Sequence, residues 1–534
     1  MKKNLLLITG VFCWICSFGQ GEIDAFRLSE NDLSGTARGQ AMGGAFGALG
    51  GDITGVAINP AGIGIYRTSE INGSLGLAST GIQTQWQKSP ISKSDNMNLT
   101  FDNISYVGYY PMGDEVLQSL NFGFSYNKTN SFNRNYKANG RGMETSLIDY
   151  IKGITDGVRH ESFSPSRGDD VYNDPNISWL SVLGADGGLI NFVKNTRDEY
   201  STIVEPGETV DSHLNVSEKG YMDSYDFTLG ANLSNTLYLG ATMSFKSIDY
   251  RMDSRYEEQF LGGNGFVLEN YLQTTGSGYQ INIGAIWRPI DFLRLGFAYH
   301  SPVWWELKDS YQGWLTPDGL EREYKDKNGN IIKEPIGQVH TPDNAFANYR
   351  FQSPYSCVFS IAGILGKKAI ISLDYEIKDY RSMYLDDENE TGSVYNNQNE
   401  AIDKHFRFTS TIRGGLEYRF TSRFSGRLGC ALIQHPYEKS FKNNEIEVAS
   451  IGTVPHYVIK GDAKYWTAGI GYRFTPNFYI DAAFVSRTQT DDVYFFPQME
   501  TNRPEGGEYT SYKPIPASSK NNTYKGLITF GYKF

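Results

Sequence analysis

Apolar and polar residues alternate with a period of two along most of the chain from residue 69 onward. Leu120, Phe122, Phe124 and Tyr126 share one phase, and Ile281, Ile283, Ala285 and Trp287 repeat it. Successive side chains of a β-strand point to opposite faces, so this pattern predicts strands with one apolar and one polar face. The final segment alternates in the same way and ends on the aromatic residue Phe534.

The alternating segments separate into fourteen predicted strands joined by links of two kinds. Even-numbered strands lead into short links such as Ser234-Asn235 and Thr475-Pro476, whereas odd-numbered strands, except the fifth, lead into long ones. Short turns on one side and longer loops on the other are typical of outer-membrane barrels. The fold class we expect is all-β: a 14-stranded antiparallel transmembrane β-barrel with both termini in the periplasm. The predicted strands cover 69–86, 99–110, 119–137, 223–233, 236–258, 264–288, 292–308, 346–364, 369–383, 404–420, 424–436, 458–474, 477–496 and 521–534.

The segment before the first strand, residues 36–66, is rich in Gly and Ala and nearly free of charge. Its glycines at positions 39, 43, 47 and 51 recur every four residues, a spacing that lets backbones approach closely. Asn59-Pro60-Ala61 ends the run, and Pro60 forces a turn there. A segment so broken by glycine needs an enclosure, so we expect it to lie in the barrel lumen as an N-terminal plug.

Several motifs in this region resemble those of a known family. Ala37-Arg38, Met42-Gly43-Gly44-Ala45, Asp52 and Asn59-Pro60-Ala61-Gly62, in that order, resemble the FadL-type outer-membrane transporters of hydrophobic compounds (long-chain fatty-acid, OMPP1 and TodX-like). The resemblance covers residues 21–67 and, by pattern, the barrel. It implies passive uptake of hydrophobic, fatty-acid-like molecules. The plug and gating residues under this hypothesis are Gly43, Gly44, Gly47, Asn59, Pro60 and Ala61.

Residues 1–20 read as a secretory signal peptide, with Lys2-Lys3 before an apolar core. We therefore expect a signal peptide at 1–20, a plug at 21–67 and a barrel at 68–534. The remaining sequence has no apolar run of the roughly 18–20 residues that a helical span requires. The net charge of -11 argues against nucleic acid as a partner. Export without a helical anchor leaves the periplasm, secretion or the outer membrane, and the barrel pattern favours the outer membrane of a Gram-negative bacterium.

Two of the four cysteines leave with the signal peptide. Cys357 and Cys430 alternate in phase with apolar neighbours and should face lipid on strands eight and eleven. At about 4.8 Å per strand they lie too far apart for a disulfide, so two unpaired thiols are expected.

The longest predicted outer loop covers 138–222 and should be partly helical. Residues 142–154 have helical spacing of apolar residues, and 177–193 form the most apolar stretch outside the signal peptide and plug. One interpretation is a ligand catchment, and the other is two helices that bury these faces against each other. The candidate ligand-binding residues are Leu147, Ile151, Trp179, Leu183, Ile190 and Phe192.

Polar residues on the inward phase are expected to line the lumen. Asp374 and Glu376 share this phase in strand nine and should pair with inward arginines or with plug amides. Trp304 and Trp305 at a strand end suit an interfacial aromatic girdle.

No catalytic, metal or cofactor site is expected, and the protein should not be an enzyme. The seven histidines are scattered, and the HExxH, GxSxG and phosphate-loop motifs are missing from the sequence.

The expected partners follow from the barrel: hydrophobic small molecules, outer-membrane lipid and lipopolysaccharide, and the barrel-assembly machinery that reads the aromatic C-terminus. A monomer is expected. Two alternative functions stay open. Related plug-bearing barrels serve as shuttles in protein secretion, and long outer loops also suit a surface receptor or adhesin.

Overall fold

The computed structural model describes residues 21–163, 170–174, 176–205, 207–325, 330–343, 345–366, 368–388, 394–442, 452–501 and 510–534. The predicted signal peptide, residues 1–20, lies outside the described part.

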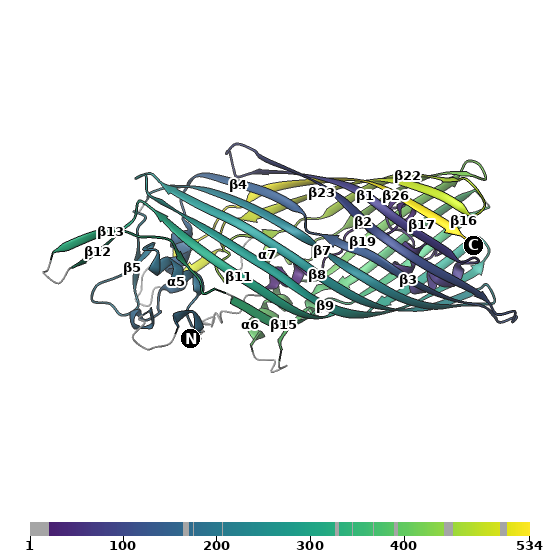
Figure 1. Cartoon of the computed structure of the whole chain (residues 1–534), viewed down its shortest axis with the longest axis horizontal. Helices are drawn as coiled ribbons and strands as arrows, with labels where there is room; N and C mark the ends of the chain where they lie inside the picture. Colours follow the sequence, from purple (N-terminus) through teal and green to yellow (C-terminus); the bar gives the residue numbers. More distant parts are fainter. Residues whose placement is uncertain are drawn as a thin grey trace, which may run out of the picture.

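The wall is a closed antiparallel barrel of fourteen strands, as the sequence predicted. The first strand pairs with both the second and the last, which closes the sheet on itself. Figure 1 shows the short turns and the C-terminus gathered at one end and the long loops at the other. The unbroken passes are β1 (Glu70–Gln85), β2 (Ser92–Pro111), β7 (Val210–Leu233), β8 (Leu237–Phe260), β9 (Gly265–Ile290), β19 (Phe408–Arg419), β20 (Phe424–Ile433), β23 (Phe478–Tyr494) and β26 (Ala517–Lys533).

Five passes that the sequence predicted as single strands are divided. Pro302 and Pro354 lie in two of the breaks, where a residue without an N–H cannot continue the ladder. The divided passes are β3 (Leu117–Ser131) with β4 (Arg134–Met143), β10 (Leu293–His300) with β11 (Trp304–Asp318), β15 (Ala345–Gln352) with β16 (Ser356–Leu365), β17 (Ala369–Asp379) with β18 (Tyr384–Asp387), and β21 (Tyr457–Ile459) with β22 (Ala463–Arg473).

The outer face of the wall is apolar in the phase that the alternation predicted. Leu229, Ile283 and Trp466 are exposed on it. Cys430 is exposed and Cys357 half-buried, and both are unpaired, as expected. The expectation that Trp305 belongs to an interfacial aromatic girdle is wrong. Trp305 is buried and lines the lumen, because it directly follows Trp304 and so points to the opposite face of the strand.

One side of the wall rises far beyond the membrane. Strands β7, β8 and β9 contain 24, 24 and 26 residues, whereas about 9–11 tilted residues cross a bilayer. On the outward face of β8, apolar residues end at Phe245, and charged residues follow. Arg251 pairs there with Asp249, and Arg255 pairs with Glu257 and Glu269. This change marks the outer boundary of the membrane.

The outer loops carry most of the helices and several short hairpins. Strand pairing reaches Met143 and resumes at Val210, so the irregular part of the 138–222 loop is shorter than the sequence indicated. A helix stands at 396–405, where the tenth strand was expected to begin. The elements are α4 (Leu147–Thr155), η2 (His160–Phe163), η4 (Val171–Asn173), α5 (Trp179–Asp186), β5 (Ile190–Phe192), β6 (Tyr200–Thr202), β12 (Glu321–Lys325), β13 (Ile331–Pro335), β14 (Val339–His340), η5 (Tyr380–Ser382), α6 (Asn396–His405), α7 (Lys439–Lys442), β24 (Met499–Thr501) and β25 (Thr510–Tyr512). Within the described part of the chain, none of the helices is long and apolar enough to cross a membrane.

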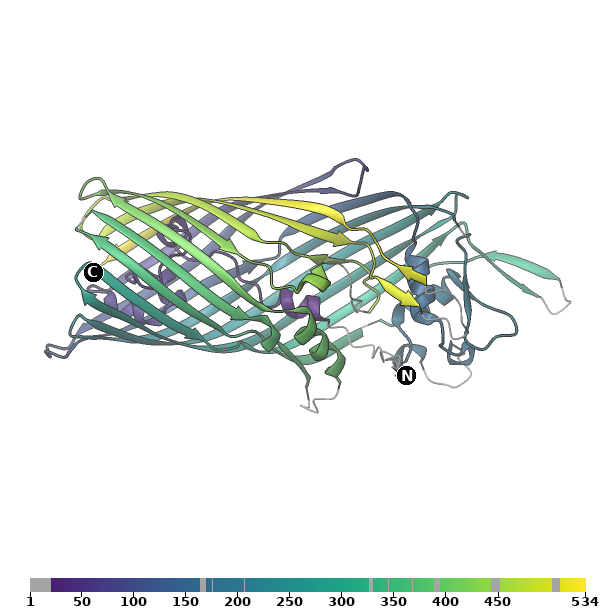
Figure 2. The same cartoon turned by 180° about the vertical axis from the view of Figure 1, so that it is seen from behind.

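Residues 21–69, the described part of the chain before β1, lie inside the barrel (Figure 2). They form α1 (Glu22–Arg27), α2 (Ala37–Ala41), α3 (Ile53–Ile58) and the 3-10 helix η1 (Pro60–Ile65). Helix α2 ends just before Gly43-Gly44, and α3 ends at the Asn59-Pro60 turn that the sequence predicted.

Candidate functional site

The segment from Thr36 to Tyr66 is packed against the inner wall of the barrel. Met42, Ala45 and Phe46 of this segment are fully buried. Thr36 caps α2, and its hydroxyl donates to Asp52, which itself caps α3. These caps fix two very short helices that would not form alone in water.

The corner at Asn59 is fastened by its own side chain. The amide Nδ2 donates to the carbonyl of Gly47 at 2.7 Å and to that of Ala285 in β9 at 3.2 Å. The Oδ1 atom accepts the N–H of Ala61 at 3.1 Å, which caps η1 behind Pro60. Side-chain to backbone hydrogen bonds of this kind are typical of Asn at a turn, and here they hold the corner that Pro60 was predicted to form.

The plug glycines lie where the chain turns against the wall. Gly43 and Gly44 have φ angles of 63° and 75°, a region that glycine enters without strain. The N–H groups of Phe46 and Gly47 both donate to Oδ2 of Asp374 in β17, each at 2.9 Å. Asp374 therefore binds plug amides, and the neighbouring Glu376 pairs with Arg413, as the sequence predicted for these two carboxylates.

Glycines of the wall make room for the plug, which the sequence reasoning missed. A Cβ at Gly284 would lie 2.0 Å from Oδ1 of Asn59, and one at Gly240 would lie 2.3 Å from the carbonyl oxygen of Pro60. The same close approach of plug backbone recurs at Gly296, Gly415 and Gly429. In the sequence, a glycine on the polar, lumen-facing phase of a wall strand was the signal that the plug approaches the wall there.

Buried charges fasten the other side of the plug. Nε of Arg38 in α2 and Nε of Arg427 in β20 both lie 2.8 Å from Oε2 of Glu417. Arg427 also reaches Asp481 at 2.6 Å. Removing one member of such a buried chain leaves an uncompensated charge, so the chain strongly favours the seated plug.

The N-terminal end of the plug segment reaches the outer loops. Phe26 packs against the rings of Tyr380, Phe406 and Tyr437. Glu22 lies 3.2 Å from Nδ1 of His405 in α6. The segment thus connects the plug in the lumen to the loops above it.

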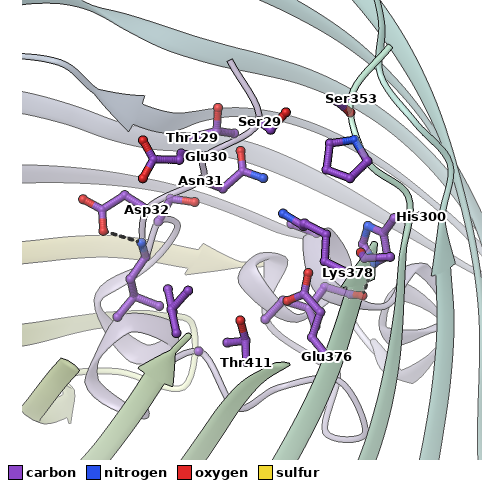
Figure 3. A pocket seen from close by; sticks show the side chains of 18 of the residues that line it. Ser29, Glu30, Asn31, Asp32, Thr129, His300, Ser353, Glu376, Lys378 and Thr411 are labelled. Carbon is purple, nitrogen blue, oxygen red and sulfur yellow. Dashed lines mark hydrogen bonds between the residues drawn. The ribbon is translucent and has the colours of Figure 1, made fainter. Parts of the chain in front are cut away.

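A cavity of about 250 Å³ lies between the plug and the outer loops (Figure 3). Its wall side is polar, with Ser, Thr, Asn, Lys and Glu side chains from many strands. Its outer side includes Phe26, Val303 and Trp305. His300 borders it and donates through Nε2–H to the carbonyl of Ile58 in the plug at 2.8 Å.

The wall has a break beside a second cavity of about 130 Å³. Strands β2 and β3 pair only as far as Asn103 and Asn127, although β2 goes on pairing with β1 beyond that point. The plug segment crosses the inner side of the break, where the N–H of Asp32 donates to Thr129 of β3 at 2.8 Å. Glu30 to Leu33 line both cavities, as do Tyr465, Arg487 and Gln489 of the wall, so this strap forms part of the partition between the two cavities.

The six candidate ligand residues lie in the outer loops, and none of them is among the described residues that line the lumenal cavity. Leu147, Ile151, Leu183 and Ile190 are buried together in one apolar cluster, and Trp179 is almost as buried. Phe192 is 49% exposed and contacts the rings of His160 and Tyr200. This geometry is that of the second interpretation, in which α4 and α5 bury their apolar faces against each other.

The described residues contain no group of three or more His, Cys, Asp or Glu able to hold a metal ion. Several lumenal carboxylates instead contact an arginine, a lysine or plug amides, as Glu417, Asp102 and Asp374 do.

The model of the family described as outer membrane protein transport protein (OMPP1/FadL/TodX) matches residues 259–534. No curated protein matches the chain. A solved FadL homologue from Pseudomonas aeruginosa superposes with a TM-score of 0.50 at 14% identity, over 94% of this chain and 99% of that one. The toluene transporters TodX of Pseudomonas putida and TbuX of Ralstonia pickettii give TM-scores of 0.46 and 0.45 at 11% and 13% identity, each over 94% of this chain and 99% of the other. At these identities the likeness concerns the fold.

Proposed function

The chain belongs to the OMPP1/FadL/TodX family of outer membrane transport proteins, and we propose that it takes up hydrophobic molecules resembling long-chain fatty acids by passive passage through its plugged barrel. Membership of the family places it in the outer membrane of a Gram-negative bacterium, among transport proteins and not enzymes. One observation carries the proposal: the plug is seated below a cavity that the outer loops cover.

The proposed route begins at the outer loops, since a hydrophobic molecule must first leave the polar lipopolysaccharide layer. Burial of apolar area lowers its free energy by about 25 cal/mol per Å². From the cavity it continues either past the plug corner at Asn59 or around the strap at Asp32 to the break between β2 and β3. A shift of the Gly43 to Ala61 region opens the first route, and a shift of the strap opens the second.

The proposal includes the organisation expected from the sequence. A signal peptide at 1–20 is removed, 21–67 serves as plug and 68–534 as barrel. The monomer sits among lipopolysaccharide after insertion by the barrel-assembly machinery. The pairing of β26 with β1 supports a fully closed wall, and there the N–H of Phe534 donates to the carbonyl of Ser69 at 3.0 Å.

A reversible tether tests the need for plug movement. A Cβ at Gly47 would lie 3.1 Å from that of Ser360 in β16, slightly closer than the roughly 3.5–4.5 Å of a disulfide. The pair Gly47→Cys and Ser360→Cys is introduced with Cys357→Ala and Cys430→Ala. Cells without another fatty-acid transporter are then given radiolabelled oleate.

We expect oxidised cells to lose uptake and reduced cells to regain it, while either single cysteine variant responds to neither treatment. Equal uptake in both states contradicts plug movement at this point. A gene deletion separates the transport and secretion functions: loss of oleate uptake supports transport, and loss of a set of surface proteins with uptake intact overturns it.

A further inference from the structure

The outer surface of the barrel carries a shallow hollow beyond the membrane boundary. It has a volume of about 750 Å³ and crosses the outward faces of β4, β7, β8, β9 and β11. Figure 1 shows these strands on one side of the barrel, where they reach past the other strands towards the outer loops. Because most of its lining residues are on the outward phase of their strands, the hollow opens to the surroundings of the barrel and not to the lumen.

The height of the hollow follows from the register of β8. The outward apolar residues of this strand end at Phe245, whereas Asp253 and Arg255, eight and ten residues further along the same face, line the hollow. At about 3.3 Å per residue and a tilt of about 40°, the hollow lies about 20–25 Å above the outer boundary of the membrane. In the outer leaflet this level contains the sugars of lipopolysaccharide, above the phosphate groups of its lipid part.

Two aromatic rings give the hollow a surface that suits a sugar ring. Tyr271 and Trp314 are half-buried, and they are diagonal neighbours because Trp314 pairs with Glu269, two residues before Tyr271. The hydroxyl of Tyr271 donates to Oε1 of Gln273 at 2.9 Å, which orients the tyrosine ring. Aromatic rings offer flat apolar faces against which the C–H groups of a sugar pack, while amides and carboxylates bind its hydroxyl groups.

Polar groups around the two rings are available for such hydroxyls. The Oδ1 atom of Asn135 is shielded from solvent, yet none of the described residues donates a hydrogen bond to it. Within the same described part of the chain, the side chains of Lys137 and Asp253 form neither a hydrogen bond nor an ion pair. Lys137 and Arg255 balance Asp253 and Glu269, so the lining has no net charge. A neutral, hydroxyl-rich ligand therefore fits the hollow better than a polyanion does.

We propose that this hollow binds the oligosaccharide of the lipopolysaccharide that surrounds the barrel. The same strand contacts lipid at a lower level, where Met243 and Phe245 are exposed. Lipopolysaccharide carries its sugars on a lipid anchor, so one molecule contacts both levels of the wall. A protein partner is disfavoured, because the core of a protein interface is apolar and depleted of charge. None of the exposed large hydrophobic side chains of the described chain lines the hollow.

This inference goes beyond transport, since it concerns the outside of the wall. The bound oligosaccharide fastens the raised side of the barrel to the sugar layer of the membrane. The lumen, the plug and the two cavities beside it are not part of this contact, so uptake through the barrel does not depend on it.

The test is calorimetric titration of the purified full barrel, in detergent and freed of lipopolysaccharide. The probe is the lipid-free oligosaccharide released by mild acid from the lipopolysaccharide of the same bacterium, and a dextran of similar length is the comparison. The variants are Tyr271→Ala, Trp314→Ala, Trp314→Phe and Asn135→Ala. Tyr384→Ala, which removes a tyrosine of β18 that is 42% exposed and is not among the described lining residues, is the matched control. Heat-dependent gel mobility checks the assembly of each variant.

We expect the oligosaccharide to bind wild type and each of the two aromatic-to-Ala variants to weaken binding about tenfold, through loss of a packed ring. Asn135→Ala should weaken it about fivefold, through loss of a hydrogen bond. Trp314→Phe keeps a ring, so it and Tyr384→Ala should stay within about threefold of wild type. Dextran should bind at least about tenfold more weakly, since the polar groups of the hollow discriminate between hydroxyl patterns.

Equal binding of the oligosaccharide to wild type and to Trp314→Ala overturns the site. Dextran binding as tightly as the oligosaccharide overturns its assignment to lipopolysaccharide. The protein alternative is tested in intact cells by replacing Trp314 with the photoreactive residue benzoylphenylalanine. A cross-link to lipopolysaccharide supports the inference, and a cross-link to a protein alone overturns it.

Oleate uptake separates this inference from the proposed function. Cells that carry any of these variants should take up oleate as wild type does. If the oligosaccharide does not bind while wild-type cells take up oleate, the inference fails and the proposed function stands. If the oligosaccharide binds as expected but wild-type cells take up no oleate, the proposed function fails and the binding site stands.

Discussion

Asn59 and Gly47 are joined by a hydrogen bond of 2.7 Å from the side-chain amide of one to the main-chain carbonyl of the other. The bond closes a loop of the plug, while the N–H of the same Gly47 is held by Asp374 of the wall. One plug residue is therefore bound at both its peptide groups, once from within the plug and once from the barrel.

Replacement of Asn59 by Ala should loosen this corner while the barrel still assembles. The carbonyls of Gly47 and Ala285 lose a donor and the N–H of Ala61 loses an acceptor, which costs about 1–3 kcal/mol for buried groups. Hydrogen exchange should be faster over residues 44–66, and oleate uptake should fall. The exposed Asn173→Ala is the control, and equal exchange in the two variants would show that the corner does not depend on Asn59.

The substitution Gly284→Ala should push the plug away from the barrel wall at Asn59. The added Cβ overlaps Asn59, which must shift at a cost of about 1–3 kcal/mol. At Gly526 a Cβ meets nothing within 4 Å. In planar bilayers we expect Gly284→Ala to show more frequent ion conductance than wild type, and Gly526→Ala to match wild type. Indistinguishable variants would contradict the close fit of plug and wall.

His456, in the outer loop before β21, should make that loop sensitive to acid. Burial lowers the pKa of its imidazole from 6.5 to about 4, with Arg27 and Arg134 adding to the effect and Glu218 opposing it. The opened loop therefore binds the proton more tightly, so stability is fully present above pH 6.5 and is lost as pH falls towards 4. At about 1.4 kcal/mol per pKa unit the loss is at most about 3 kcal/mol.

Hydrogen exchange over residues 452–459, corrected for the intrinsic pH dependence, measures this loss between pH 7.5 and pH 5. His456→Gln should remove the dependence because it does not titrate. A wild-type loop with the same opening free energy at both pH values would rule out His456 as its cause.

The apolar outer loop offers a test of its two interpretations. Leu183→Ala leaves a cavity in the packed cluster and should destabilise the loop by about 2–5 kcal/mol. Phe192→Ala removes a half-exposed ring and should destabilise it much less. Limited proteolysis reports the stability, and dodecanoate binding reports any ligand contact. Weakened binding in a proteolytically stable Phe192→Ala would restore the catchment interpretation.

The sequence was sufficient for the features that depend on local pattern. The period of two and the parity of the links predicted the number of strands, and the inward phase placed Asp374 and Glu376 in the lumen. The side chain of Asn59 acts on the backbone near its own turn, so its hydrogen bonds were predictable from the turn residues.

Features that depend on register between distant strands could not be predicted in this way. Lys246 and Lys378 are 132 positions apart and share a cavity only through the pairing of the strands between them. Glu22 meets His405, which is 383 positions away in the sequence. The division of two passes did have a local signal in Pro302 and Pro354, whereas nothing in the alternation marked the break after Ser131.

The order of the chain also constrains how the protein reaches its final form. The segment that fills the lumen precedes every wall strand, with one end among the outer loops and the other leading into β1 at the periplasmic side. The wall closes only when β26 meets β1. The plug is therefore synthesised before the wall strands, and the wall closes around it when β26 pairs with β1. Later loss of the plug from the lumen would require cleavage of the chain or its withdrawal past the wall.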